Sequence, residues 1–208
     1  MVRVPHPYAP LADGWGSVSP GVRIATIMKP LLLAAVLSLN LFAFAQPAQP
    51  SADEVMAQAK TQASAEHKHI LLVFSASWCG PCKRFDALLN DPQTGPIIAR
   101  SFVIARLDVG EKPGDTKHAD SPGAVALRAS LKGADAGYPY LVMLDAEGKP
   151  IVNSFCPSGC DPPGENIGYP ATPGEIAWFM KMLQQSAPAM PAKDATAVQR
   201  WLQQRAHS

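Results

Sequence analysis

The sequence predicts an α/β fold in which helices cover both faces of a central sheet. Two observations carry this prediction. Apolar runs of strand length alternate with segments that begin on helix-capping residues, and two cysteines stand where the run Ile70–Phe74 passes into a helix. The 208 residues, of which 47% are hydrophobic, are enough for one domain with a single core.

The first helix is predicted over residues 52–66. Ser51 and Glu54 have the spacing of a capping box, in which each residue binds the backbone N–H of the other. Apolar residues behind the box recur on one helical face, namely Val55, Met56, Ala59 and Ala63. This helix leads directly into the strand at residues 70–74.

The middle of the chain alternates between the two kinds of element. The helix that follows the cysteines is expected to end near residues 90–92, where proline appears, and residues 102–107 indicate a strand. A short helical segment, 121–131, lies in a stretch of Gly, Pro and charged residues. A strand at 141–144 then turns into a second strand at 150–155.

The last helices are indicated by a second capping box. Thr172 and Glu175 form it, with Pro173 at the first helical position, and one face of the helix carries Ile176, Phe179, Met180 and Leu183. Proline-bearing residues 187–191 indicate a linker before a short terminal helix. We therefore divide the chain into an N-terminal extension with a signal peptide (1–45), a domain (46–186), and a linker with a short helix (187–208).

The run Trp78-Cys79-Gly80-Pro81-Cys82 is the most informative feature. The N-terminus of a helix carries partial positive charge, which favours a thiolate over a thiol and can lower a cysteine pKa from about 8.5 to about 7. We therefore predict that Cys79 is the nucleophile and that Cys82, in the first turn, resolves a mixed disulfide. The alternatives are half of a zinc site and an inert pair that has this spacing by chance. Against a zinc site, Cys156 and Cys160 have a different spacing in a Pro/Gly-rich stretch.

This pentapeptide, followed by Lys83, resembles the active site of thioredoxins, and the resemblance extends over about residues 70–183. It implies a thioredoxin-like fold with a central mixed sheet, and a redox-active Cys79–Cys82 disulfide flanked by client-binding residues Trp78, Gly80 and Pro81. The run Tyr138-Pro139 resembles the family's cis-proline element, which implies a substrate-docking role for both residues. An ordinary proline at a strand start is the alternative for Pro139.

Val73 departs from the family pattern. Thioredoxins carry a buried aspartate six residues before the first cysteine, where it helps to move the proton of the resolving thiol. Without that acid, we expect Cys82 to lose its proton less readily. Attack by Cys79 is not affected by this change.

Cys156 and Cys160 form a second candidate pair in a segment too rich in Pro and Gly for a helix. A structural disulfide that fixes this loop is the favoured interpretation. The resemblance to thioredoxins places Cys156 near the substrate groove, so a second redox pair that exchanges with Cys79 and Cys82 is an alternative, as are metal binding and free thiols.

The N-terminus has the layout of a secretory signal. Residues 28–30 form a short basic region that carries Lys29, residues 31–44 form an apolar core, and Ala43-Phe44-Ala45 is a small-x-small cleavage site. The true start could be Met28, and an uncleaved membrane anchor is the alternative. Cleavage near Ala45 would leave 15 basic and 16 acidic residues, and this near-neutral chain has no basic patch that would indicate nucleic-acid binding.

We therefore predict a periplasmic or secreted thiol–disulfide oxidoreductase, with no cofactor and no metal site. Its expected partners are the thiols or disulfides of client proteins and a membrane or soluble electron donor or acceptor, and we expect a monomer. Two alternatives from other classes are a redox-inert or slow adaptor, favoured by Val73, and a copper-handling protein that uses the cysteine pairs. His67, His69 and His118 lack acidic or cysteine neighbours at ligand spacing and are interpreted as surface residues.

Overall fold

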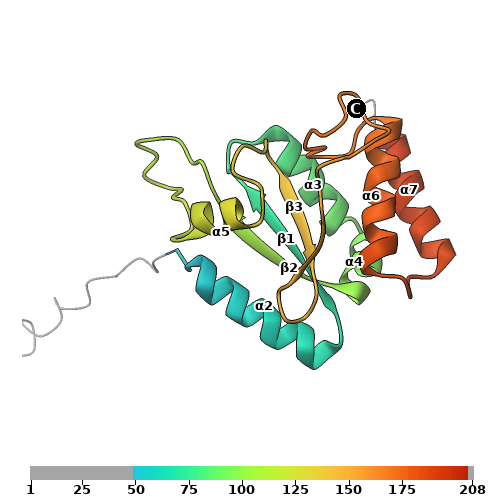
Figure 1. Ribbon diagram of the computed structural model, residues 1–208, viewed down its shortest axis with the longest axis horizontal. Helices are drawn as coiled ribbons and strands as arrows, with labels where there is room; N and C mark the ends of the chain where they lie inside the picture. The colour runs from blue at the N-terminus through green and yellow to red at the C-terminus, as the bar shows by residue number, and fades with distance from the viewer. Residues whose placement is uncertain (1–48, 206–208) are drawn as a thin grey trace, which may run out of the picture. The chain divides into compact units, whose positions relative to one another are not determined.

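A four-stranded mixed sheet forms the centre of the computed structural model, which describes residues 49–205. Its strands are β1 (His69–Ser75), β2 (Phe102–Asp108), β3 (Tyr140–Leu144) and β4 (Pro150–Asn153), in the order β2-β1-β3-β4. β2 is parallel to β1, whereas β3 is antiparallel to both β1 and β4 (Figure 1). The predicted α/β thioredoxin-like fold is confirmed.

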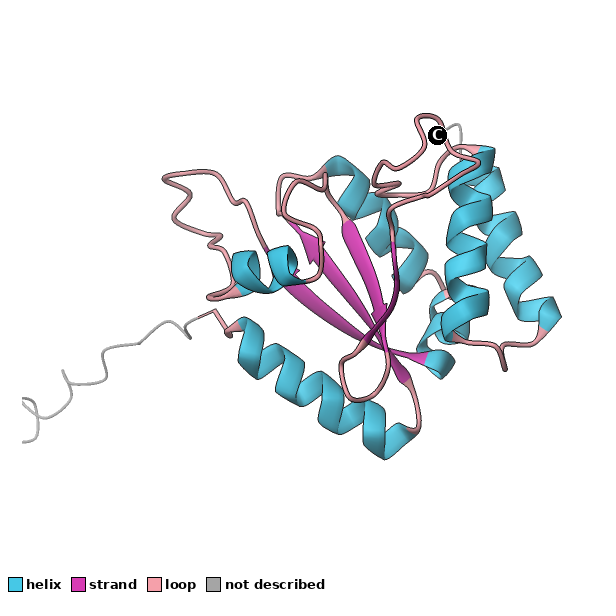
Figure 2. Ribbon diagram, viewed as in Figure 1, coloured by secondary structure: helices cyan, strands magenta, loops and turns pink. Residues whose placement is uncertain are grey.

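Helices connect β1 to β2 and β2 to β3, whereas a turn joins β3 to β4 (Figure 2). Both predicted capping boxes are present, since Ser51 and Glu54, and likewise Thr172 and Glu175, satisfy each other's backbone N–H groups. The helices of the described region are α2 (Ala52–Glu66), α3 (Gly80–Asn90), α4 (Gly95–Ser101), α5 (Ala124–Ser130), α6 (Pro173–Ser186) and α7 (Ala192–Arg205).

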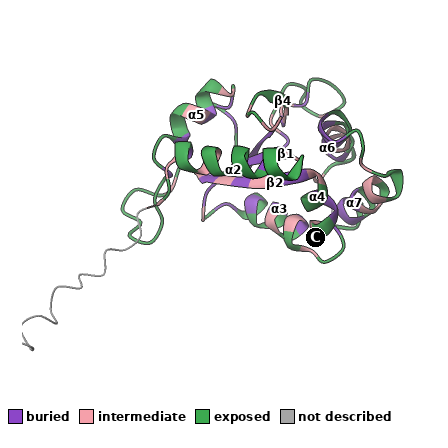
Figure 3. Cartoon of the chain, turned by 90° about the horizontal axis from the view of Figure 1, so that it is seen from below, coloured by how far each residue is buried: buried purple, intermediate pink, exposed green. Residues whose placement is uncertain are grey.

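The two faces of the sheet bury separate apolar cores, because successive side chains of a strand point to opposite sides. Leu71 and Val73 of β1 pack with α3, α4, α6 and α7, whereas Ile70, Leu72 and Phe74 pack with α2 and α5. Figure 3 shows α2 and α3 on opposite sides of the sheet, each with an exposed outer face. A central strand buried on both faces explains the continuous apolar run of β1.

Three elements differ from the sequence-based expectation. α4 was not predicted, because Gly95-Pro96 resembles a turn and the helix has only seven residues with no side-chain cap. α5 begins later than expected, after Gly123 with its positive φ of 81°. β4 ends at Asn153, because Phe155 forms its own bridge with Asn166.

The C-terminal helix α7 has 14 residues and packs against α6 through Val198, Trp201 and Leu202, which are buried in the same core as Phe179. The predicted signal peptide, residues 1–45, lies outside the described residues. Within residues 49–205, no helix has the length and apolarity that a membrane span requires.

Candidate active site

Cys79 caps the N-terminus of α3 directly beyond the end of β1. Its sulfur accepts a hydrogen bond of 3.0 Å from the backbone N–H of Cys82, and the two residues form a disulfide with their Cα atoms 5.2 Å apart. In the reduced state the same N–H and the helix dipole would stabilise a thiolate on Cys79. Both cysteines are nearly buried, at 2% and 4% exposure. The geometry therefore gives the two sulfurs different environments.

Exposed residues surround the buried disulfide. Trp78 is 46% exposed, and Gly80 and Pro81 are also exposed. The indole of Trp78 is nevertheless fixed, since its Nε1 donates to the carbonyl of Gly110 over 2.9 Å. A Cβ atom added at Gly80 would meet no atom within 4 Å, so the space beside Cys79 is open.

Tyr138, the residue before Pro139, lies against the cysteine pair. The peptide bond between them is cis, as the resemblance to thioredoxins implied. Tyr138 packs against a small cluster formed by Ala76, Cys79 and Cys82, and its ring meets that of Trp78 edge-on at 5.9 Å between centroids. Residues that are 60 positions apart in the sequence therefore form one surface around the two sulfurs.

Arg128 of α5 holds Tyr138 in place, and the sequence analysis did not find it. Its guanidinium donates to the Tyr138 hydroxyl over 3.2 Å, lies 4.8 Å from the centre of that ring, and donates to the carbonyl of Ala136. The side chain is only 8% exposed. Among the described residues, no carboxylate lies within ion-pair distance of it, so its charge is balanced by the aromatic ring and the carbonyl.

Asn166 fixes the other side of the same segment. Its Nδ2 donates to the carbonyls of Gly137 and Pro139, over 2.9 and 3.1 Å, and its Oδ1 accepts from the buried hydroxyl of Ser154 over 2.6 Å. The Ser154 oxygen in turn accepts from the backbone N–H of Leu141. Asn166 therefore ties the cis-proline segment to the start of β3.

Burial also affects a tyrosine beside this segment. Tyr140 is fully buried, its hydroxyl donates to the carbonyl of Leu131, and burial raises its pKa to about 12. The folded core therefore favours the protonated, uncharged form of the Tyr140 side chain. Its ring stacks on Phe74 of β1 at 5.9 Å, which connects the segment to the second core.

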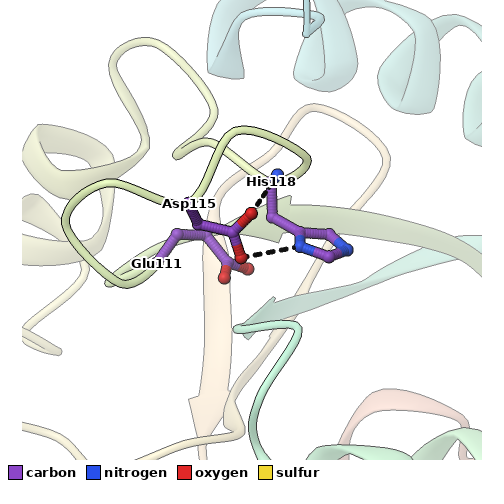
Figure 4. Close-up of side chains that lie close together, drawn as sticks. All are labelled: Glu111, Asp115 and His118. Carbon is purple, nitrogen blue, oxygen red and sulfur yellow. Dashed lines mark hydrogen bonds and ion pairs between the residues drawn. The ribbon is translucent and has the colours of Figure 1, made fainter.

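The loop after β2 is bound to the residues before Cys79 through Glu111. Its carboxylate accepts from the backbone N–H and the hydroxyl of Ser77, both over 2.6 Å. Asp115 and His118 lie beside Glu111 (Figure 4). The expectation that His118 lacks an acidic neighbour is wrong, because its Nδ1 lies 2.9 Å from Asp115, and this hydrogen bond lowers the pKa of the Asp115 carboxyl. The spacing of three residues was the signal that could have revealed the pair.

The second cysteine pair forms a disulfide that closes a loop against α6. The Cα atoms of Cys156 and Cys160 are 6.2 Å apart, and Cys156 is fully buried in the core that contains α6. Gly159 of this loop approaches Gly174 so closely that a Cβ at Gly174 would lie 2.1 Å from its carbonyl oxygen. This pair is not part of the small cluster around Cys79.

Comparison with known proteins identifies the fold. The sequence model of a thioredoxin-like family matches residues 52–146, which include both cysteines of the first pair and Tyr138-Pro139. No curated protein matches the sequence significantly.

Solved structures with a similar fold have low identity to this chain. A disulphide isomerase from Xylella fastidiosa Temecula1 is 19% identical, with 72% of this chain and 86% of that chain covered and a TM-score of 0.40. A DsbH oxidoreductase is 22% identical, with 66% and 82% covered and a TM-score of 0.41. A thioredoxin-fold protein from Helicobacter pylori is 19% identical, with 67% and 84% covered and a TM-score of 0.36. None of these likenesses bears on activity.

Proposed function

Because residues 52–146 match the sequence model of a thioredoxin-like family, we propose that this chain is an exported thiol–disulfide oxidoreductase that exchanges disulfides with client proteins through Cys79 and Cys82. The observation that carries the proposal is the hydrogen bond from the Cys82 N–H to the Cys79 sulfur at the start of α3. A sulfur in this position is the better nucleophile at neutral pH, since the thiolate is the reactive form.

The exchange proceeds in two steps. The Cys79 thiolate attacks one sulfur of a client disulfide, which breaks the client bond and forms a mixed disulfide. Cys82 then attacks Cys79, so that the Cys79–Cys82 bond forms and the client leaves with two thiols. The Cα separation of 5.2 Å lies within the range for a disulfide, so the second step requires no large backbone movement. With reduced clients the same steps run in reverse.

The exposed surface around the sulfurs is the proposed client site. The proposed site comprises Trp78, Gly80 and Pro81 next to the two cysteines in the sequence, together with Tyr138, which packs against the cysteines, and the adjoining Pro139. An aromatic ring fixed by a hydrogen bond offers contact area without a large loss of side-chain entropy. An extended client segment would lie across this surface.

The compartment is part of the proposal and rests on the sequence. A signal-like N-terminus places the mature chain in the periplasm or outside the cell, where disulfides persist. Continued turnover there requires a membrane or soluble partner that supplies or removes electrons. We propose a monomer for the mature form.

Trapping of mixed disulfides tests the proposed function. With Cys82→Ser, the second step is blocked, and clients in a periplasmic or secreted extract should remain bound to Cys79 through a bond that dithiothreitol cleaves. The matched control is Cys79→Ser, which has the same composition but should trap far less. If both variants trap equally little, while both remain folded, the oxidoreductase proposal fails.

Val73 favours a second candidate function, a redox-inert or slow adaptor that uses the same surface to hold a partner. Val73 is 1% exposed and its side chain lies in the core below α3, so no carboxylate occupies that position. An adaptor would bind its partner equally well with Cys79→Ser and Cys82→Ser, and its binding would survive dithiothreitol. The trapping experiment therefore separates the two candidates.

A further inference from the structure

A polar pocket borders the resolving cysteine, Cys82. Its volume is about 450 Å³, and its walls include Cys82, Lys83 and Asp86 of α3 together with Arg106 and Asp108 of β2. A water molecule takes about 30 Å³ of liquid volume, so the pocket can hold several. The nearly buried resolving cysteine thus borders a space in which water and charged groups meet.

The register of the sheet explains why these charges lie close to the position where thioredoxins carry their aspartate. Val73 of β1 pairs with Arg106 of β2, and Ser75, two residues later, pairs with Asp108. Alternate residues of a strand point to the same face, so all four side chains lie on the face that α3 covers. Asp108 stands at the carboxyl end of β2, beside the strand end that leads to Cys79.

The two carboxylates of the pocket differ in their partners. Asp86 forms an ion pair with Arg106. Asp108 accepts from neutral groups, with Nε2 of Gln49 at 2.7 Å and the hydroxyl of Ser75 at 3.5 Å, and no cation pairs with it in the described part of the chain. Protonation of a carboxylate that is paired with a guanidinium costs the free energy of that ion pair. A carboxylate that accepts only from neutral donors has no ion pair to lose, so it takes up a proton more readily.

We infer that Asp108 accepts the proton of Cys82 through the water of this pocket, and so replaces on β2 the carboxylate that Val73 lacks on β1. The inference rests on the proposed function. Lys83 and the Asp86–Arg106 pair are the other charged groups that line the pocket. Glu111 does not line the pocket, and its carboxylate accepts hydrogen bonds from the backbone N–H and the hydroxyl of Ser77.

The proton movement completes the second step of the exchange. The S–H bond of Cys82 breaks as water carries its proton to the Asp108 carboxylate. The resulting thiolate attacks Cys79, the Cys79–Cys82 bond forms, and the bond from Cys79 to the client sulfur breaks. The electron pair leaves with the client sulfur, which takes up the proton directly or from solvent. The client disulfide is reduced and the dithiol is oxidised.

Rapid mixing of the reduced full-length protein with a disulfide peptide separates the two steps. The signal is the change in tryptophan fluorescence, to which Trp78 beside the disulfide contributes. Attack by Cys79 is second order and scales with peptide concentration, whereas resolution by Cys82 is first order. For Asp108→Asn we expect the first-order rate at pH 7 to fall about tenfold or more. The slowing should become smaller as the pH rises beyond about 8.5, where hydroxide begins to take the cysteine proton without help from a carboxylate. The second-order rate should not change.

Asp86→Asn is the matched control, because it removes the other carboxylate of the pocket, and it should not slow resolution. Asp108→Glu keeps a carboxylate and should restore most of the rate. The inference would be overturned if Asp108→Asn slowed the first-order resolution rate by the same factor at every pH. It would also be overturned if Asp86→Asn slowed resolution as much as Asp108→Asn does. If the wild-type protein shows no exchange at all, the proposed function fails instead; if it exchanges and Asp108→Asn matches it, only the role of Asp108 fails.

Discussion

Replacing the second disulfide, as Cys156→Ala with Cys160→Ala, should destabilise the domain and leave the chemistry of Cys79 unchanged. Four positions separate the two cysteines, and closing a ring of about five residues restricts the unfolded chain by about 2 kcal/mol. Cys156 is fully buried against α6, so loss of its sulfur removes about 1 kcal/mol of apolar packing as well. We therefore expect the free energy of unfolding to fall by about 3 kcal/mol.

Thermal denaturation followed by circular dichroism, without reductant, measures this loss. For a domain of this size, about 3 kcal/mol corresponds to a fall of about 6–12 °C in the melting temperature. The control is Ser158→Ala, which changes an exposed residue of the same ring and keeps the bond. An unchanged melting temperature would refute the packing argument. A shift of more than about 30 mV in the potential of the Cys79–Cys82 pair would indicate that the two pairs exchange.

Three further predictions concern the site and its support. Iodoacetamide should modify Cys79 about tenfold faster than Cys82 at pH 7 in the reduced protein, as shown by peptide mapping; equal rates would contradict the N-cap argument. Asn166→Ala removes two hydrogen bonds to backbone carbonyls and should lower stability by about 2 kcal/mol in urea unfolding, whereas no change would mean that water replaces them. The raised pKa of Tyr140 means that the unfolded chain ionises first, so stability should fall between about pH 10 and 12, and Tyr140→Phe should flatten that fall.

Local patterns explain most of what the sequence predicted. The capping boxes at Ser51 and Thr172 need only residues three positions apart, and the cysteine pair of α3 lies within a single helical turn. The supports of the site have no such local signal. Arg128 reaches Tyr138 ten positions away, and Asn166 reaches the same segment from 27 to 29 positions away.

The pocket beside Cys82 could not be predicted from the sequence either, because its lining residues come from segments that are far apart in the chain. Asp108 follows an apolar run and resembles an ordinary residue at the end of a strand. Only the parallel register of β1 and β2 places it beside Ser75, on the face that α3 covers. The departure from the thioredoxin pattern at Val73 was visible in the sequence. Which charged residues lie beside Val73 could not be predicted, because that depends on which strand pairs with β1 and in what register.

The reduction potential of the Cys79–Cys82 pair tests the central claim most directly. A variant with Cys156→Ala and Cys160→Ala keeps only the Cys79–Cys82 pair. It is equilibrated in glutathione buffers, and alkylation of the free thiols reports the fraction reduced. We predict a reversible two-electron transition between about −270 mV, which would indicate a reductase, and about −120 mV, which would indicate an oxidase. A pair that stays oxidised below about −300 mV, as structural disulfides do, would contradict the assignment of this site to disulfide exchange.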